Sequence, residues 1–191
     1  RTDAGVHAIG QVFHFDCDRK IDAFARAVNS QLPADIFVKN IDQTDDGFHA
    51  RYDARWKHYR YLVNCGRYDL FNRNLQYQYC RLLDTDAMRK AADLFVGEKD
   101  FSSFNATRFS EMENQVRTVY RLQVNSDNDV VSFDVWGNGF LRHMVRMMVG
   151  ALIEVGCGNL SSEDVEVMLE ARKKGSNRYN APSCGLYLVE I

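Results

Sequence analysis

The pattern of apolar and polar positions predicts a chain of mixed strands and helices. Runs rich in apolar and β-branched residues, bounded by turn residues, predict strands at 11–16, 36–41, 55–65, 117–125, 130–136 and 185–191. Apolar residues spaced three or four apart predict helices at 22–32, 85–96, 140–155 and 161–172. Asp22 and Ser161 are suited to begin their helices, and Gly97 is suited to end one. Residues 126–129 would form a hairpin turn.

These elements together predict the fold class. The strands are long, few connections suit parallel crossovers, and helices intervene between the strands. We therefore expect an α+β protein in which helices pack on one face of a mainly antiparallel sheet. The 191 residues suffice for one large domain, or for two small ones fused on a shared core.

The predicted helix at 140–155 is apolar nearly all round, which is typical of a buried helix. Arg142 and Arg146 are spaced i, i+4, and His143 lies three residues before Arg146, so a narrow polar seam is expected along the helix. A buried cation is costly unless it pairs with a carboxylate or phosphate. Arg146 should therefore have an acidic partner, either in a structural ion pair or in a functional site. The same charges interrupt the apolar run, so it does not predict a membrane span.

The predicted strand at 55–65 places cations and aromatic rings on one face. Residues on that face alternate along the strand and are Arg55, Lys57, Tyr59 and Tyr61. Rings of this kind stack on unpaired bases, and cations hold phosphates. The alternative is an amphipathic strand whose tyrosines pack in the core while its Lys and Arg side chains reach water.

The first eight residues crowd Arg1, Asp3 and His7 among small neighbours. Asp3 followed by Gly5 is typical of a simple turn, in which the carboxylate caps local amides. The small neighbours would also let a ligand approach the backbone closely.

Two later segments admit two interpretations each. Residues 100–104 would form either a capping turn with core aromatics or a loop that contacts substrate, with Phe101 in the core and Phe104 open to either role. Gly185 and Leu186 would either line the floor of a pocket or belong to a buried edge strand.

Composition limits the classes of protein. A content of 46% hydrophobic residues allows a sizeable core, while a net charge of −2 means that any RNA contact must come from a local patch. The five cysteines are odd in number and widely spaced, with no C-x-x-C pair, which disfavours a disulfide framework or a zinc site. A reducing cytoplasm fits such cysteines best.

Several motifs together resemble the tRNA pseudouridine synthase A family. They are RTDAGVHA at the start, FHARYDA running into KHYRY, DFSSF, GNGFLRHMVRMMVGALIEVG and finally APSCGLYLVEI. They follow the family order and span essentially the whole chain, and the combination is far more specific than any single motif. Family members have further residues ahead of the first motif, so we expect the natural chain to begin upstream of Arg1.

The resemblance implies a fold and residue roles. The expected fold is the pseudouridine synthase core, with two RRM-like halves that share one sheet and a central cleft, here residues 1–80 and 81–191. Asp3 resembles the catalytic carboxylate, and Arg146 resembles its paired arginine. Tyr59 resembles the ring that stacks on the target uracil, and Arg1 the residue that holds the flipped-out nucleotide. Further contacts with the substrate or the RNA are expected from Leu186, Arg55, Lys57, Arg142, His143 and Phe104.

The implied reaction is the isomerisation of uridine to pseudouridine at positions 38 to 40 of the tRNA anticodon stem-loop, by a cytoplasmic homodimer. The reaction needs an ionised carboxylate, and we expect no metal or cofactor. Two other hypotheses remain: a non-catalytic RNA-binding module, and a carboxylate-dependent hydrolase acting on a small substrate. The first would not require Asp3, Tyr59 and Arg146 to converge, and the second needs another catalytic acid near Asp3.

Overall fold

The computed structural model describes residues 2–18, 24–106 and 114–191. Contacts divide the chain into a larger unit, residues 1–11 with 55–191, and a smaller unit, residues 12–54. The sheet of the larger unit joins residues on both sides of position 80, because residues 57–64 pair with residues 130–137. The division into halves at residue 80 stays a prediction.

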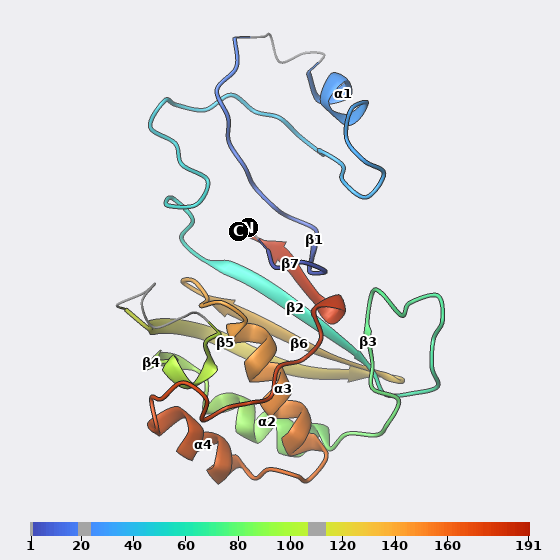
Figure 1. Ribbon diagram of the computed structural model, residues 1–191, viewed down its shortest axis with the longest axis vertical. Coiled ribbons are helices and arrows are strands. Elements are labelled where there is room, and N and C mark those ends of the chain that lie inside the picture. The colour runs from blue at the N-terminus through green and yellow to red at the C-terminus, as the bar shows by residue number, and fades with distance from the viewer. Residues whose placement is uncertain (1, 19–23, 107–113) are drawn as a thin grey trace. The chain divides into compact units, whose positions relative to one another are not determined.

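The larger unit is built on a seven-stranded sheet in the described part of the chain, with the order β1-β7-β2-β6-β5-β4 and β3 beside β2 (Figure 1). The strands are β1 (His7–Ala8), β2 (Lys57–Asn64), β3 (Tyr77–Gln78), β4 (Gly97–Asp100), β5 (Val116–Asp127), β6 (Val130–Gly137) and β7 (Leu186–Glu190). The pairs β2–β6, β2–β7, β4–β5 and β5–β6 are antiparallel, whereas the short β1 and β3 pair in parallel. The predicted mainly antiparallel sheet is confirmed.

Three helices cover one face of this sheet: α2 (Thr85–Asp93), α3 (Met144–Gly156) and α4 (Ser162–Glu170) (Figure 1). Alternate strand residues such as Tyr61, Val63 and Phe133 point into the core on that side and are almost fully buried. Eleven of the thirteen residues of α3 are buried, as expected for a helix that is apolar all round. The α+β class is thereby confirmed, and it agrees with the pseudouridine synthase fold that the motifs implied.

The predicted caps have mixed outcomes. Ser161 begins α4 through a capping box with Asp164, as expected. Asp84 begins α2 by accepting hydrogen bonds from two backbone amides. Gly97 does not end α2: the helix stops at Asp93, and Gly97 begins β4 with φ +102°.

The start of α3 differs from the prediction. His143 adopts a left-handed conformation, φ +60°, and the helix begins only at Met144. The carbonyl of Arg142 accepts a hydrogen bond from the Ala106 amide, outside any helix. The expected polar seam along one helix is therefore wrong, since Arg142 and His143 belong to the loop that leads into α3. Hydrophobic spacing alone did not reveal this break.

The smaller unit has less regular structure than predicted. Its described helix is α1 (Phe24–Asn29), shorter than the predicted 22–32, and Asp22 lies outside the described residues. Residues 11–16 and 36–41 do not form strands, although their patterns favoured them. No helix among the described residues is long and apolar enough to cross a membrane.

Candidate active site

The first loop brings Asp3 to the beginning of α3. β1 pairs with the last strand, β7, and so ties this loop to the larger unit. The Val6 amide donates to the Asp3 carbonyl at 3.1 Å, which closes a tight turn. Gly5 has φ +76°, and a Cβ there would lie 2.7 Å from Ser183 Oγ. Glycine is therefore required at this position, both by the backbone conformation and by the close approach of the turn at 183–185.

Arg146, on the first turn of α3, faces the Asp3 carboxylate. Its Nη1 lies 3.8 Å from Asp3 Oδ2, with the two side chains 13% and 35% exposed. Its Nε donates to the Ala181 carbonyl at 2.8 Å, which fixes the plane of the guanidinium. The expectation that Arg146 has an acidic partner is confirmed.

His143 contacts the same oxygen of the Asp3 carboxylate. Its Nε2 lies 3.4 Å from Asp3 Oδ2, and its Nδ1 lies 3.1 Å from the amide nitrogen of Asn180. Burial lowers the pKa of His143, and the charges of Arg146 and Arg142 lower it further against the opposing effect of Asp3. The lowered pKa favours the neutral form of the imidazole.

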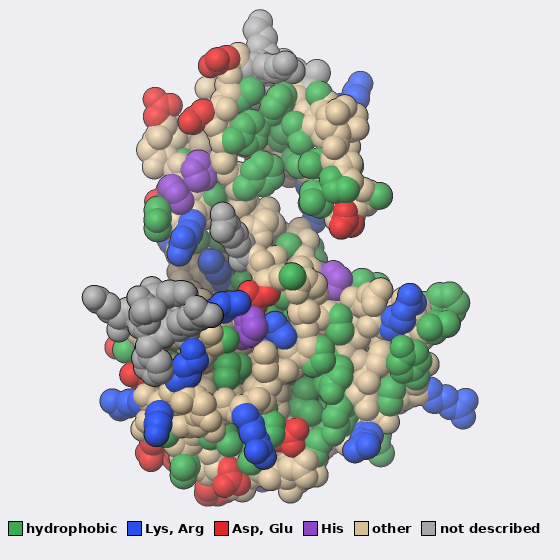
Figure 2. Space-filling view, in the orientation of Figure 1, with side chains coloured by type: hydrophobic (Ala, Val, Ile, Leu, Met, Phe, Trp, Pro, Cys, Tyr) green, Lys and Arg blue, Asp and Glu red, His purple; other side chains and the backbone are tan. Residues whose placement is uncertain are grey.

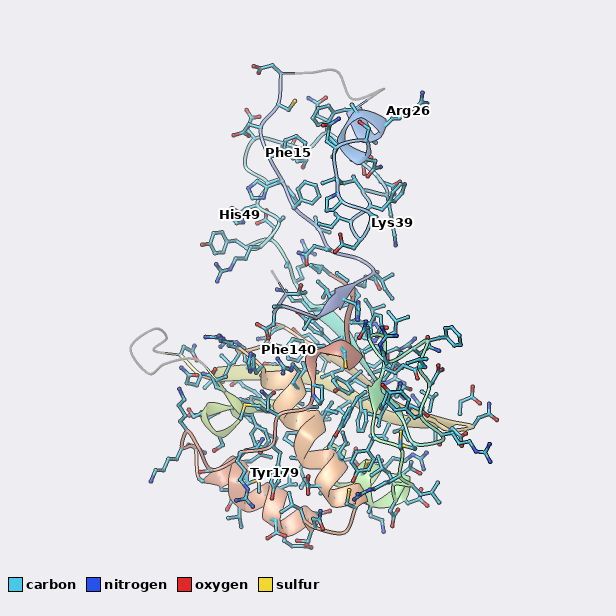
Figure 3. All side chains as sticks on the ribbon, turned by 45° about the vertical axis from the view of Figure 1, so that its right-hand side comes forward. Phe15, Arg26, Lys39, His49, Phe140 and Tyr179 are labelled. Atoms are coloured by element: carbon cyan, nitrogen blue, oxygen red, sulfur yellow. The ribbon has the colours of Figure 1, made fainter. Side chains whose placement is uncertain are left out.

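Tyr59 of β2 closes the site from the sheet. Burial, and then the charge of Asp3, raise the pKa of Tyr59 to about 12, so its phenol keeps its proton. Its ring packs edge-on against Phe140, with ring centroids 5.4 Å apart. Figure 3 shows Phe140 just before α3, at the end of the helix that carries Arg146. Tyr61, two residues further, donates its hydroxyl to the Pro182 carbonyl and so fixes the turn that precedes Leu186.

These side chains line a cavity of about 200 Å³. Pockets for drug-sized ligands measure ~300–1,000 Å³, so this one suits a single flat base better than a whole nucleotide. Among its described lining residues, Asp3 is the one carboxylate. Among the described residues, no group of three or more His, Cys, Asp or Glu side chains is placed to hold a metal ion.

The structure brings most of the predicted residues together. Those that line the cavity are Asp3, Lys57, Tyr59, Arg142, His143, Arg146 and Leu186. Arg55 is exposed just before β2, and Arg1 lies outside the described residues. In Figure 2, Lys and Arg side chains are scattered over the visible face of the larger unit.

Phe104 is not accessible to RNA, contrary to one of its two predicted roles. It is fully buried and packs against Phe95, with ring centroids 5.1 Å apart. We therefore assign Phe104, like Phe101, to the hydrophobic core.

Sequence reasoning missed Thr2, Phe140 and Asn180. Thr2 adjoins a predicted site residue, and Phe140 was treated only as part of an apolar helix. Asn180 is separated from His143 by 37 residues, and nothing in its local sequence connected it with the site.

A close backbone contact with α3 positions residues 177–181, the segment that carries Asn180. Asn177 donates its side-chain amide to the Met147 carbonyl, and the Ala181 amide donates to the Arg146 carbonyl. A Cβ on Gly150 would lie 2.9 Å from the backbone carbon of Tyr179, on the segment that runs beside α3 (Figure 3). Gly150 therefore permits the approach that places Asn180 and Ala181 at the site.

Replacing Gly150 with alanine should push this segment away from α3. Overpacking of this kind costs ~1–3 kcal/mol, and we expect both a lower free energy of unfolding and weaker catalysis. Denaturant unfolding and initial rates would measure the two effects. Gly47→Ala is the matched control, because a Cβ at Gly47 would meet no atom within 4 Å and its φ is not in the left-handed region. Full activity in Gly150→Ala would contradict the positioning role.

The comparisons with known proteins agree with this geometry. A fold that joins a mainly antiparallel sheet to helices on one face, with one carboxylate beside a guanidinium and a phenol, fits enzymes that modify RNA bases. The family model described as tRNA pseudouridine synthase matches residues 91–191. Proteins named tRNA pseudouridine synthase A from Geobacillus sp. (strain WCH70) and Bacillus subtilis (strain 168) are each 42% identical to the chain. In both cases the match covers all of this chain and 78% of the relative. The protein of that name from Exiguobacterium sp. is 44% identical, with the same coverage.

The chain therefore belongs to the tRNA pseudouridine synthase family, and the relatives that it resembles are of the A type.

Proposed function

We propose that this chain isomerises uridine to pseudouridine in tRNA, with Asp3 as the catalytic carboxylate. Membership of an isomerase family that acts on tRNA supports the reaction. The single observation that carries the assignment of the site is the convergence of Asp3, Arg146 and Tyr59 on one small cavity.

The reaction exchanges one bond to the ribose for another. The bond between N1 of uracil and C1′ of ribose breaks, and a bond between C5 and C1′ forms. The C5 hydrogen leaves as a proton, and N1 gains a proton. Nothing is oxidised or reduced, and no group is transferred from another molecule.

The residues of the cavity suit these requirements. An ionised carboxylate acts as nucleophile or base, and the Arg146 guanidinium lies 3.8 Å from Asp3 as its counter-charge. The detached uracil must be kept from water and held against the ribose, for which a cavity of about 200 Å³ is well sized. Leu186, only 6% exposed, gives the base an apolar contact. Lys57 and Arg142 place positive charge at the same cavity, where phosphates of the RNA need it.

The Tyr59 ring is proposed to stack on the target base. Flipping a base out of its stack costs a few kcal/mol, and stacking on an aromatic side chain returns ~1–3 kcal/mol. Tyr59→Ala should therefore reduce kcat/KM by roughly 10- to 100-fold, while Tyr59→Phe, which keeps the ring, should lose much less. Initial rates with a tRNA transcript would test this. Equal losses in both variants would show that the hydroxyl matters rather than the ring.

The structure bears on the two competing hypotheses. A hydrolase would need a second acid, and the described residues that line the cavity include none besides Asp3. A non-catalytic RNA-binding module gives no reason for a carboxylate, an arginine and a tyrosine to converge. Both alternatives are therefore disfavoured.

The family resemblance supports finer proposals: uridines 38 to 40 of the anticodon stem-loop as targets, a homodimer, and a cytoplasmic location. Pseudouridine mapping on tRNA from cells that lack this protein would test the first. Loss of pseudouridine at those positions is expected, and an unchanged map would overturn the assignment. Analytical ultracentrifugation would test the homodimer.

A further inference from the structure

A second contact to the Asp3 carboxylate comes from His143, which the proposed mechanism has not used. The imidazole lies between Asp3 and Asn180, with Nε2 3.4 Å from the carboxylate and Nδ1 3.1 Å from the amide nitrogen. His143 also holds a left-handed backbone conformation at φ +60°, which residues other than glycine adopt rarely. The end of the loop thus directs this ring towards the carboxylate.

The two neighbours of the ring require one tautomer. A neutral imidazole carries its proton on one nitrogen and has a lone pair on the other. A lone pair on Nε2 would face a carboxylate oxygen, which is also an acceptor, so Nε2 must carry the proton. Nδ1 is then the acceptor, which agrees with the amide nitrogen of Asn180 facing it.

We propose that Asn180 and His143 position the catalytic carboxylate: Asn180 selects the tautomer in which His143 donates from Nε2 to Asp3. The proposal rests on the assignment of Asp3 as the catalytic group. It makes His143 a positioning residue that acts through Asp3. Both His143 and Arg146 approach Oδ2, which leaves Oδ1 of Asp3 for the substrate.

Burial and the charges around His143 together favour the neutral form of its ring. Asp3 comes from the first loop, Arg146 from α3 and Arg142 from the loop before α3, and Lys57 and Tyr59 of β2 line the same cavity. The net effect lowers the pKa of His143, with burial as the largest cause. A neutral donor orients the carboxylate without adding another buried cation beside Arg146.

Asn180→Asp tests the tautomer directly. A carboxylate at position 180 accepts a hydrogen bond from Nδ1–H, so neutral His143 would carry its proton on Nδ1 and turn the lone pair of Nε2 towards Asp3. Protonated His143 donates from both nitrogens, and the new carboxylate raises the pKa of His143. Activity of this variant should therefore be near that of the wild type at about pH 6, and should fall roughly 10- to 100-fold as the pH rises to about 8.5. The wild-type rate should show no such fall, because its neutral imidazole already donates to Asp3.

Asn180→Ala is the matched control, since it removes the partner without imposing the other tautomer. We expect a smaller loss in kcat that does not vary over the same pH range. Asn180 is exposed, so neither substitution should prevent folding, and circular dichroism would check this. An Asn180→Asp profile parallel to that of Asn180→Ala would overturn the proposal.

A second pair of variants gives an independent test. His143→Gln keeps an amide donor near the position of Nε2, whereas His143→Gly removes the donor and suits the left-handed backbone. Gln should retain most of kcat, and Gly should lose it roughly 10- to 100-fold with little change in KM. Equal losses would contradict the donor role. Asp3→Asn, measured in parallel, separates the two claims: an active Asp3→Asn overturns the catalytic assignment itself, whereas an inactive one leaves the His143 tests decisive.

Discussion

Asp3→Asn is expected to abolish pseudouridine formation, by roughly 10⁴-fold or more, while the variant still folds and binds tRNA. Asparagine matches aspartate in size and keeps its side-chain hydrogen bonding, but it carries no charge and is neither a nucleophile nor a base. Arg146 retains its hydrogen bond to the Ala181 carbonyl, so the loop and helix should stay in place. The loss should therefore appear in kcat rather than in affinity.

Quantitative pseudouridine analysis of a tRNA transcript, together with filter binding, would measure the two effects separately. Asp93→Asn is a suitable control because it makes the same chemical change at the exposed end of α2. The control should behave as the wild type. Turnover in Asp3→Asn within tenfold of the wild type would rule out Asp3 as the catalytic group.

Arg146→Met should have the second largest effect. It removes the cation 3.8 Å from the Asp3 carboxylate and the hydrogen bond to the Ala181 carbonyl, while methionine preserves part of the apolar stem. Removing one preorganised electrostatic partner from an active site costs ~10²–10³ in kcat. Arg146→Lys keeps a positive charge but cannot make both contacts in the same geometry, so its activity should fall between those of Met and Arg.

Asp3 and Arg146 should also act as a unit in catalysis. Residues that cooperate in one catalytic step give strongly non-additive losses, so Asp3→Asn combined with Arg146→Met should be hardly slower than Asp3→Asn alone. Initial rates of the two single variants and the double variant form the required cycle. Losses that multiply would show that Arg146 acts independently of Asp3, and that its ion pair is structural.

The sheet and the central residues of the site could be predicted because local patterns determine them. The two-residue period of β2 predicted that Lys57, Tyr59 and Tyr61 share one face; Lys57 and Tyr59 line the cavity, whereas Tyr61, further along that face, is buried in the core. The cost of burying a lone guanidinium correctly predicted an acidic partner for Arg146. Both predictions depend only on residues within a single strand or helix.

Features that depend on distant segments could not be predicted in this way. The break at His143 is a backbone feature within an apolar run, and periodicity does not detect it. Asn180 reaches the site only because its segment packs against Gly150 of α3. Residues 11–16 and 36–41 do not form the expected strands, since the tendency of a segment to form a strand depends on its context as well as on its own pattern.

The central claim is that one carboxylate, paired with an arginine in a small cavity, carries the isomerisation. Tritium release from tRNA labelled at C5 of uridine tests it most directly, because the C5 hydrogen leaves only when the new bond to the ribose is completed. With enzyme in excess over tRNA, the wild type should release the label in a single turnover. Asp3→Asn should form the complex with tRNA and release none. Release by Asp3→Asn at a rate comparable to that of the wild type would contradict the account.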